Sequence, residues 1–338
     1  MTILVTGGCG YIGSHTILDL LENGYDVVSI DNNSRSTTKL LEGVKKIAGR
    51  DIINYKTDLC NLEETRKVFQ KHKIDGIIHF AAFKAVDESV NVPLLYFQNN
   101  LISQINILQC VEEFKIPNFV FSSSCSVYGN ADEIPVTEET VLQEPESPYG
   151  RTKKIGEDII KDISRATNTS FILLRYFNPA GAHPSAIIGE LPFGRPSNLV
   201  PAITQFAAGK LPALKVYGTD YDTRDGSCIR DLIHVCDIAH AHTLAMNYLA
   251  AGKGTNKCET LNLGTGNGVT VLEAIHAFEK VSGKKLNYEL SARRPGDIVA
   301  VYANNNKARK MLDWNTKFGL EDIMGTAWKW ELEMAKAQ

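Results

Sequence analysis

The sequence of 338 residues has 43% hydrophobic residues, 22% charged residues and a net charge of −3. This balance is typical of a globular protein and excludes attraction of nucleic acid or anionic membranes by bulk charge. No basic leader precedes the first apolar run, and no run approaches the ~20 residues of a membrane span, so a cytoplasmic protein is expected. Seven cysteines without a CxxC pair or zinc spacing predict reduced thiols and no metal site.

Short β-branched runs alternate with longer amphipathic stretches in the first half of the chain. Strands are predicted at Ile3–Thr6, Val27–Ile30, Ile52–Tyr55, Ile77–Phe80, Phe119–Ser122 and Phe171–Leu174, and helices at Ile12–Glu22, Leu62–His72, Pro93–Phe114 and Tyr149–Thr167. The segment after Ile30 is polar. Apolar strands without strict alternation fit a parallel sheet that helices cover on both faces. The predicted fold class is therefore α/β, with a Rossmann-like doubly wound parallel sheet.

The texture of the chain changes after Tyr176, where prolines and glycines indicate loops. Regular segments return as a helix at Ile233–Tyr248, a strand at Thr260–Leu263, helices at Val271–Val281 and Lys307–Leu312, and a tail with Trp328 and Trp330. We expect residues 1–176, with a later contribution from about 233–263, to form the first domain, and residues 177–338 a smaller, discontinuous, mixed α/β lobe. The two lobes should pack around a shared cleft, where ligands usually bind.

A glycine-rich turn, Gly7-Gly8-Cys9-Gly10-Tyr11-Ile12-Gly13, follows the first strand and opens the first helix. Its glycines permit a tight turn and the close approach of a pyrophosphate, which the helix N-terminus faces. The second strand ends at Asp31, where a carboxylate accepts hydrogen bonds from ribose hydroxyls and repels a 2′-phosphate. NAD is therefore predicted over NADP, although the nearby Arg35 keeps NADP open.

Tyr149 and Lys153 lie four residues apart in a predicted helix, so that the phenol and the ammonium group share one face. Lowering the pKa of a tyrosine from about 10 by ~3 units needs ~4 kcal/mol of differential stabilisation. One nearby, partly buried cation can supply much of it. The pair indicates a tyrosine that acts as a base, but the same spacing is common on helix surfaces, and other motifs must decide.

With Ser124 upstream, these motifs resemble the extended short-chain dehydrogenase/reductase superfamily and, within it, the UDP-galactose (UDP-glucose) 4-epimerase family. The resemblance covers essentially the whole chain. Besides the glycine turn and the helix with Tyr149 and Lys153, it rests on His79–Val86, Ser122–Ser124, Val127–Gly129, Arg175–Pro179, Arg230-Asp231 and Arg293–Asp297.

The resemblance implies three groups of site residues. The catalytic group is Tyr149, Lys153 and Ser124. The cofactor group is Gly7, Gly10, Tyr11, Ile12, Gly13, Asp31, Asn32, Asp58, Leu59, Phe80, Ala81, Lys84, Asn99, Tyr149, Lys153 and Phe177. The substrate group is Ser124, Asn178, Asn198, Leu199, Val216, Tyr217, Arg230, Arg294, Asp297 and Val301. Residues 1–176 would thus form the NAD-binding domain and residues 177–338 the nucleotide-sugar-binding domain.

The activity that the resemblance implies is reversible epimerisation of UDP-galactose and UDP-glucose at sugar carbon 4, in galactose metabolism. A transient 4-keto sugar and tightly bound NAD would carry the reaction. Tyr149 would remove the hydroxyl proton, Ser124 would hydrogen-bond the same oxygen, and Lys153 would lower the pKa of the tyrosine. A homodimer is also implied, for which the helices at Pro93–Phe114 and Tyr149–Thr167 are a candidate four-helix interface.

Two classes of alternative function stay open at this point: another nucleotide-sugar-modifying enzyme, either a 4,6-dehydratase or a decarboxylase, and a non-catalytic sensor. Nucleotide-sugar 4,6-dehydratases carry adjacent Asp and Glu just after the serine-like residue, where this chain has Cys125 and Ser126, and the glutamate of decarboxylases is missing at 126 as well. A non-catalytic NAD-binding sensor is disfavoured by the intact catalytic group.

Val301 stands where family members have Tyr or Cys, and its small side chain predicts that UDP-N-acetylgalactosamine and UDP-N-acetylglucosamine are also accepted.

Overall fold

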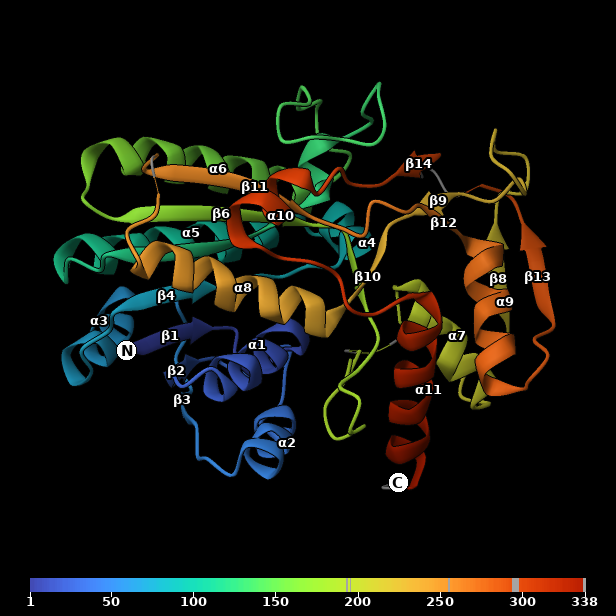
Figure 1. Ribbon diagram of the computed structural model, residues 1–338, viewed down its shortest axis with the longest axis horizontal. Helices are drawn as coiled ribbons and strands as arrows, with labels where there is room; N and C mark the ends of the chain where they lie inside the picture. Colours follow the sequence, from blue (N-terminus) through green and yellow to red (C-terminus); the bar gives the residue numbers. More distant parts are fainter. Residues whose placement is uncertain (193, 195, 255, 294–297, 337–338) are drawn as a thin grey trace.

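The computed structural model describes residues 1–192, 194, 196–254, 256–293 and 298–336. Its largest element is a seven-stranded parallel sheet in the order β11-β6-β5-β4-β1-β2-β3 (Figure 1). The strands are β1 (Thr2–Thr6), β2 (Asp26–Ile30), β3 (Ile53–Tyr55), β4 (Gly76–His79), β5 (Asn118–Ser124), β6 (Ser170–Tyr176) and β11 (Cys258–Leu263). The order of the first six strands is that of a doubly wound dinucleotide-binding sheet, so the predicted fold class is confirmed.

Helices cover both faces of this sheet. One layer holds α1 (Tyr11–Glu22), α2 (Lys39–Ala48) and α8 (Val235–Ala250), and the other holds α3 (Leu62–Lys71), α5 (Pro93–Glu113) and α6 (Pro148–Ala166). In β1, Ile3 and Val5 pack into the first layer and Leu4 into the second, because successive side chains of a strand point to opposite faces. The continuous apolar runs in the sequence follow from this double burial.

Two helices of this half are absent from the sequence prediction. The segment after Ile30, of which the sequence shows only that it is polar, contains α2. Its narrow apolar stripe packs on the core, and the helix ends at Gly49, with a φ of +67°. The second is the short α4 (Val86–Asn91). The predicted start of the later helix at Ile233 is wrong, because Ile233 lies in β10 (Leu232–His234). The His234 side chain accepts a hydrogen bond from Cys236 N at 3.1 Å and caps α8.

The C-terminal part of the chain forms a smaller mixed α/β lobe at one end of the large sheet (Figure 1). Its strands are β7 (Asn178–Ala180), β8 (Leu214–Tyr217), β9 (Ile229–Arg230), β10, β12 (Val269–Thr270), β13 (Tyr288–Ser291) and β14 (Ala300–Val301). Its helices are α7 (Leu199–Ala207), α9 (Val271–Ser282) and α11 (Leu320–Lys336), which share one core, while α10 (Asn306–Leu312) packs on α8 and β11. The tail with Trp328 and Trp330 is therefore a helix that completes the lobe.

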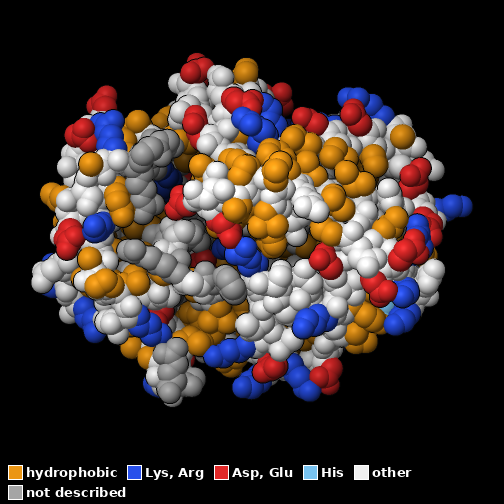
Figure 2. All heavy atoms as spheres, turned by 180° about the vertical axis from the view of Figure 1, so that it is seen from behind, with side chains coloured by type: hydrophobic (Ala, Val, Ile, Leu, Met, Phe, Trp, Pro, Cys, Tyr) orange, Lys and Arg blue, Asp and Glu red, His pale blue; other side chains and the backbone are white. Residues whose placement is uncertain are grey.

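Several large apolar side chains stay exposed on α4 and α5. Leu94 is 81% exposed, and Val90, Leu95, Ile102 and Ile105 are also exposed. Figure 2, which shows the molecule from behind, has hydrophobic side chains gathered over the part of this face where these helices lie. A contiguous apolar surface of this kind is typical of a protein–protein contact.

Other features of the described residues concern membranes, metals and thiols. No helix in the described ranges is long and apolar enough to cross a membrane. Within the same ranges, no group of three or more His, Cys, Asp or Glu side chains could hold a metal ion. All seven cysteines are free thiols.

Candidate active site

The candidate cofactor residues gather at the carboxyl ends of the parallel strands. Gly7 follows β1, Asp31 and Asn32 follow β2, Asp58 and Leu59 follow β3, Phe80, Ala81 and Lys84 follow β4, Ser124 ends β5, and Phe177 follows β6. Doubly wound sheets bind ligands at this edge. Asn99 comes from α5, where its amide donates to Asn100 Oδ1 at 2.9 Å.

The glycine turn leaves no room for side chains at its two ends. Gly7 has a φ of +71°, and a Cβ atom there would lie 2.9 Å from Ala81 N. A Cβ atom on Gly13 would lie 2.3 Å from Gly7 O. Gly10 begins α1 without a side-chain cap, so Tyr11, Ile12 and Gly13 form a first turn whose N–H groups face outward. These features fit a dinucleotide, because a pyrophosphate needs both close backbone approach and uncapped N–H groups.

Asp31 is fixed beside this turn by three donors. Its Oδ2 accepts from Cys9 N at 3.0 Å, and its Oδ1 accepts from Asn33 N at 2.9 Å and from Ser36 Oγ at 2.8 Å. Arg35, which kept NADP open in the sequence, instead pairs with Glu88 at 2.8 Å and lies over the Phe83 ring. The cradle thus presents a carboxylate, which suits the ribose diol of NAD.

Tyr149 and Lys153 lie on α6, and Ser124 lies opposite them at the end of β5. Ser147 caps the helix by accepting a hydrogen bond from Gly150 N at 3.1 Å, and Pro148 occupies its first position. The helix therefore begins one residue before Tyr149. The Lys153 Nζ atom lies 6.0 Å from the centre of the Tyr149 ring and donates to Ser122 O at 2.6 Å. The predicted shared face of the helix is therefore present.

The protein matrix shifts the pKa of both groups toward their neutral forms. Burial raises the pKa of Tyr149 to about 12, although a hydrogen bond with Ser124 opposes the rise. Burial also lowers the pKa of Lys153 to about 7, while the charge of Glu157 opposes the fall. The net shift of the Tyr149 pKa is therefore upward, because burial removes water from the phenolate. That Lys153 lowers this pKa stays a prediction of the sequence.

The cofactor and substrate groups meet at Glu190, which the sequence prediction missed. Its Oε1 atom lies 3.3 Å from Lys84 Nζ and accepts from Asn198 Nδ2 at 2.8 Å. Lys84 is an expected cofactor residue and Asn198 an expected substrate residue. No motif or spacing in the sequence links Glu190 to either of them.

The remaining substrate candidates lie on short elements of the smaller lobe. Asn178 begins β7, Leu199 begins α7, Val216 and Tyr217 end β8, Arg230 ends β9, and Val301 ends β14. The Val216 side chain is 1% exposed and packs in the core of the lobe, whereas Tyr217 is partly exposed. Arg230 donates to two backbone oxygens, Ile229 O at 2.8 Å and Ile298 O at 2.7 Å. Arg294 and Asp297 lie outside the described residues.

Two of these candidates, Asn178 and Val301, have surroundings that bear on a ligand. The Asn178 Oδ1 atom is buried and has no hydrogen-bond partner among the described residues. Such an atom is costly unless a ligand or water donates to it. Val301 is 7% exposed and packs in one cluster with Phe177, Val127 and Tyr128, so it lies beside an expected cofactor residue.

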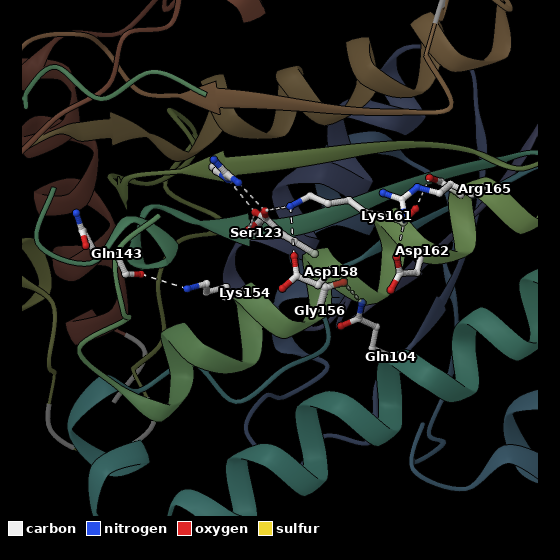
Figure 3. A network of polar contacts seen from close by, with 12 residues as sticks. Gln104, Ser123, Gln143, Lys154, Gly156, Asp158, Lys161, Asp162 and Arg165 are labelled. Carbon is white, nitrogen blue, oxygen red and sulfur yellow. Dashed lines mark hydrogen bonds and ion pairs between the residues drawn. The ribbon is translucent and has the colours of Figure 1, made fainter. Parts of the chain in front are cut away.

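Two buried carboxylates near the site are also missing from the sequence prediction. Glu157 binds Ser123 of β5, and Figure 3 shows the polar contacts of this region, with Ser123 directed toward α6 and Asp158 and Lys161 on that helix. Asp231 follows Arg230 and accepts four hydrogen bonds from Thr265, Gly266 and Ala303. The signal for Glu157 is its four-residue spacing from Lys153, and Asp231 follows Arg230 directly in the motif that carries the resemblance.

Comparisons with known proteins agree with this geometry. The family model described as GDP-mannose 4,6 dehydratase matches residues 4–326. The chain is 47% identical over 333 residues to UDP-glucose 4-epimerase 2 of Arabidopsis thaliana, covering 97% of this chain and 94% of that protein.

Two solved structures match the chain over its full length. UDP-glucose 4-epimerase from Bifidobacterium longum in complex with NAD+ and UDP matches with a TM-score of 0.95 at 41% identity, covering 100% of both chains. UDP-glucose-4-epimerase from Stenotrophomonas maltophila with bound NAD and formylated UDP-arabinopyranose matches with a TM-score of 0.97 at 42% identity, also covering 100% of both chains. The chain therefore belongs to the UDP-glucose 4-epimerase family of the extended short-chain dehydrogenases/reductases.

Proposed function

We propose that this chain is an NAD-dependent UDP-glucose 4-epimerase, which interconverts UDP-galactose and UDP-glucose through a 4-keto sugar. One observation carries the proposal: Ser124, Tyr149 and Lys153 meet at the sheet edge that also holds the glycine turn. Cys125 and Ser126, which follow Ser124 in a 3-10 helix, supply no carboxylic acid for elimination or decarboxylation. The dehydratase and decarboxylase alternatives therefore lack their acid, and a sensor would not need the intact catalytic group.

Tyr149 is the proposed base that takes the proton from the hydroxyl on sugar carbon 4. Ser124 hydrogen-bonds the phenol and is 8% exposed, so it can also hold the sugar oxygen in place. Lys153 is the group of this chain that favours the phenolate, and the Ser122 carbonyl holds its ammonium group beside the ring. A tyrosine with a pKa near 12 needs such positive charge to act near neutral pH.

The cofactor site fits NAD in the arrangement of this chain's own residues. Gly7, Gly10 and Gly13 give the backbone its close approach, and Asp31 presents its carboxylate to the ribose. When bound there, NAD would supply the hydride acceptor and donor for the redox change at carbon 4, and its positive charge would favour the phenolate of Tyr149. Lys84 and Asn99 are proposed further contacts.

The substrate site is proposed to hold the nucleotide while the sugar turns. Of the two arginines proposed to bind the diphosphate, Arg230 lies in the described part of the chain. The buried amide oxygen of Asn178 is proposed to accept a hydrogen bond from the substrate. Asn198, Leu199 and Tyr217 are proposed contacts to the rest of the nucleotide. Arg294 and Asp297 stay predictions of the sequence, since they lie outside the described residues. Anchoring at the nucleotide lets remote binding energy hold a sugar that must present both faces.

Val301 supports a wider substrate range. A valine beside Phe177 leaves more volume than a tyrosine would, so we propose that UDP-N-acetylgalactosamine and UDP-N-acetylglucosamine are accepted as well. The test is a product assay of the purified protein with UDP-galactose and UDP-N-acetylgalactosamine. Val301→Tyr should keep turnover of UDP-galactose. Its turnover of the N-acetylated sugar should fall by ~10-fold or more, because the new ring takes up the space of the N-acetyl group.

The same assay separates the candidate functions. Epimerised UDP-glucose supports the epimerase, a 4-keto-6-deoxy product would indicate a dehydratase, and no product with retained NAD would indicate a sensor. Turnover of UDP-galactose without any turnover of UDP-N-acetylgalactosamine would contradict the wider range alone.

A cytoplasmic homodimer is proposed as the working form. Its support is the exposed apolar surface of α5, with Leu94, Leu95, Ile102 and Ile105, together with its neighbour α6 (Figure 2). Two copies could bury these surfaces in a four-helix contact. Sedimentation or light scattering measures the state, and a monomer at micromolar concentration would contradict the dimer. The cytoplasmic location stays a prediction of the sequence.

A further inference from the structure

A buried ion pair lies one helical turn beyond Lys153. Glu157 is 0% exposed, and its carboxylate accepts from Arg175 Nε at 2.8 Å and from a terminal guanidinium nitrogen of Arg175 at 2.6 Å. Its Oε1 atom also accepts from Ser123 Oγ at 2.6 Å. Arg175 is anchored in turn, because it donates to the Tyr128 hydroxyl at 3.1 Å. A bidentate pair with these further contacts gives the Glu157 carboxylate one defined position.

The position of Glu157 continues the row of reactive side chains. Tyr149, Lys153 and Glu157 follow one another at four-residue intervals and so share one face of α6. Opposite them, β5 offers the Ser124 hydroxyl to Tyr149, the Ser122 carbonyl to Lys153 and the Ser123 hydroxyl to Glu157. The Glu157 contact therefore joins the same two elements that hold the base and its cation.

Glu157 also supplies negative charge to Lys153. Its charge raises the pKa of Lys153, whereas burial lowers it. From β4, His79 faces the same ammonium group, but burial lowers the pKa of His79 to about 3, so this ring is neutral. From β5, the Phe121 ring lies 4.9 Å from Nζ, and from β6 the charge of Arg175 is already paired with Glu157.

We propose that Glu157 is a positioning residue for proton transfer, which holds α6 in register with β5 and supplies the negative charge that faces Lys153. Arg175 and Ser123 keep the carboxylate in place, and Lys161 contacts it from the surface at 3.5 Å. The inference rests on the proposed function in one respect: the proton that Tyr149 takes is that of the hydroxyl on sugar carbon 4. Glu157 would thus join Tyr149 and Lys153 as a third residue of α6 that acts in proton transfer, because the protonation state of Lys153 depends on it.

Two substitutions separate charge from position. Glu157→Gln keeps the length and loses the charge, and we expect the alkaline limb of kcat to move by about one pH unit toward acid, because Lys153 then loses its proton at lower pH. At the wild-type midpoint this is about a fivefold loss of turnover. Glu157→Asp keeps the charge, so its limb should stay near the wild-type position while kcat falls. The control is Asp158→Asn, which removes the same charge from the next, 62% exposed residue and should leave the limb unchanged.

A second measurement does not depend on turnover. The titration of Lys153 is the part of the pH dependence of the free energy of unfolding that is lost in Lys153→Met, and its midpoint should move to lower pH in Glu157→Gln, because the carboxylate that is lost raises the pKa of Lys153. Glu157→Gln also leaves Arg175 buried without a charged partner, so folding is followed by thermal unfolding. If Glu157→Gln does not fold, Glu157→Asp carries the test, and a folded Glu157→Asp with wild-type kcat would contradict the positioning role.

The outcomes separate the two proposals. A wild-type protein that binds NAD and does not epimerise UDP-galactose overturns the proposed function, while the shift in the titration of Lys153 still supports Glu157. A folded Glu157→Gln variant with both the limb and the titration of Lys153 at their wild-type positions overturns the role of Glu157.

Discussion

The carboxyl edge of the large sheet and the small lobe beside it hold their candidate residues in different ways. Ser124 ends a strand, β5, whose seven residues are all buried, and Tyr149 lies on a helix of 19 residues packed against it. In the lobe, Arg230 and Val301 lie on paired strands of only two residues each, β9 and β14.

The difference shows what fixes the positions of the candidate residues in each region. At the sheet edge, layered packing along long elements fixes the reacting groups. In the lobe, β9 pairs with β12 and β14, and one side chain adds to this pairing, since the Asp231 carboxylate binds the Thr265–Gly266 turn and the backbone N–H of Ala303, two residues beyond Val301. Removal of a reactive atom at the sheet edge should therefore lower kcat. Removal of the Asp231 carboxylate, which clamps the lobe, should weaken substrate binding.

The largest effect is expected for Tyr149→Phe, at the sheet edge. The variant keeps the ring and loses the hydroxyl, so kcat with UDP-galactose should fall by about 10²–10⁴-fold while the urea midpoint stays close to wild type. Tyr248→Phe is the matched control, because the Tyr248 hydroxyl donates to Lys253 O, away from the sheet edge, and it should turn over normally. Near-normal turnover of Tyr149→Phe would remove Tyr149 from the mechanism.

The same contrast explains what could be predicted from the sequence. Apart from α2 and α4, the strands and helices around the large sheet were predicted because each apolar run is long enough to show its period, and the glycine turn and Tyr149–Lys153 spacing are local patterns. The two-residue strands of the lobe show no period, and α7 was hidden among prolines and glycines. Glu190 was missed because its contacts to Lys84 and Asn198 depend on the folded chain.

The upward pKa shift of Tyr149 could not be predicted either. The spacing gives the distance between the phenol and the ammonium group to within a helical turn, but it says nothing of how much water each group loses. Burial is the largest cause of both shifts and moves both groups toward neutrality. An argument from spacing alone therefore predicted the shared helix face and missed the net rise in the pKa of the phenol.

The second effect is expected for Asp231→Asn, which tests the clamp in the lobe. One amide oxygen replaces a carboxylate that accepts four hydrogen bonds, so at least one backbone N–H loses its partner. We expect a loss of about 2–3 kcal/mol in the free energy of unfolding and a rise in KM for UDP-galactose that exceeds any fall in kcat. Urea unfolding and initial rates measure both.

The control for the clamp is Asp222→Asn, an exposed carboxylate of the same lobe, which should change neither quantity. If Asp231→Asn lowered kcat and left KM unchanged, the small lobe would act on the chemistry, and the contrast between the two regions would not hold.

The smallest effect concerns the cost of burying Lys153 at the sheet edge. Burial lowers the pKa of Lys153 from 10.5 to about 7, so between these values the unfolded chain binds a proton that the folded chain has lost. The folded state therefore gains stability from this group as pH rises through that window, and Lys153→Met lacks the gain. Between pH 7 and 8, the free energy of unfolding of wild type should rise by about 1 kcal/mol relative to the variant. Lys154→Met, a partly exposed neighbour that pairs with Glu144, should follow wild type. Equal slopes for wild type and Lys153→Met would mean that the ammonium group is as well solvated in the folded protein as in water, and the sheet edge would then hold its cation without cost.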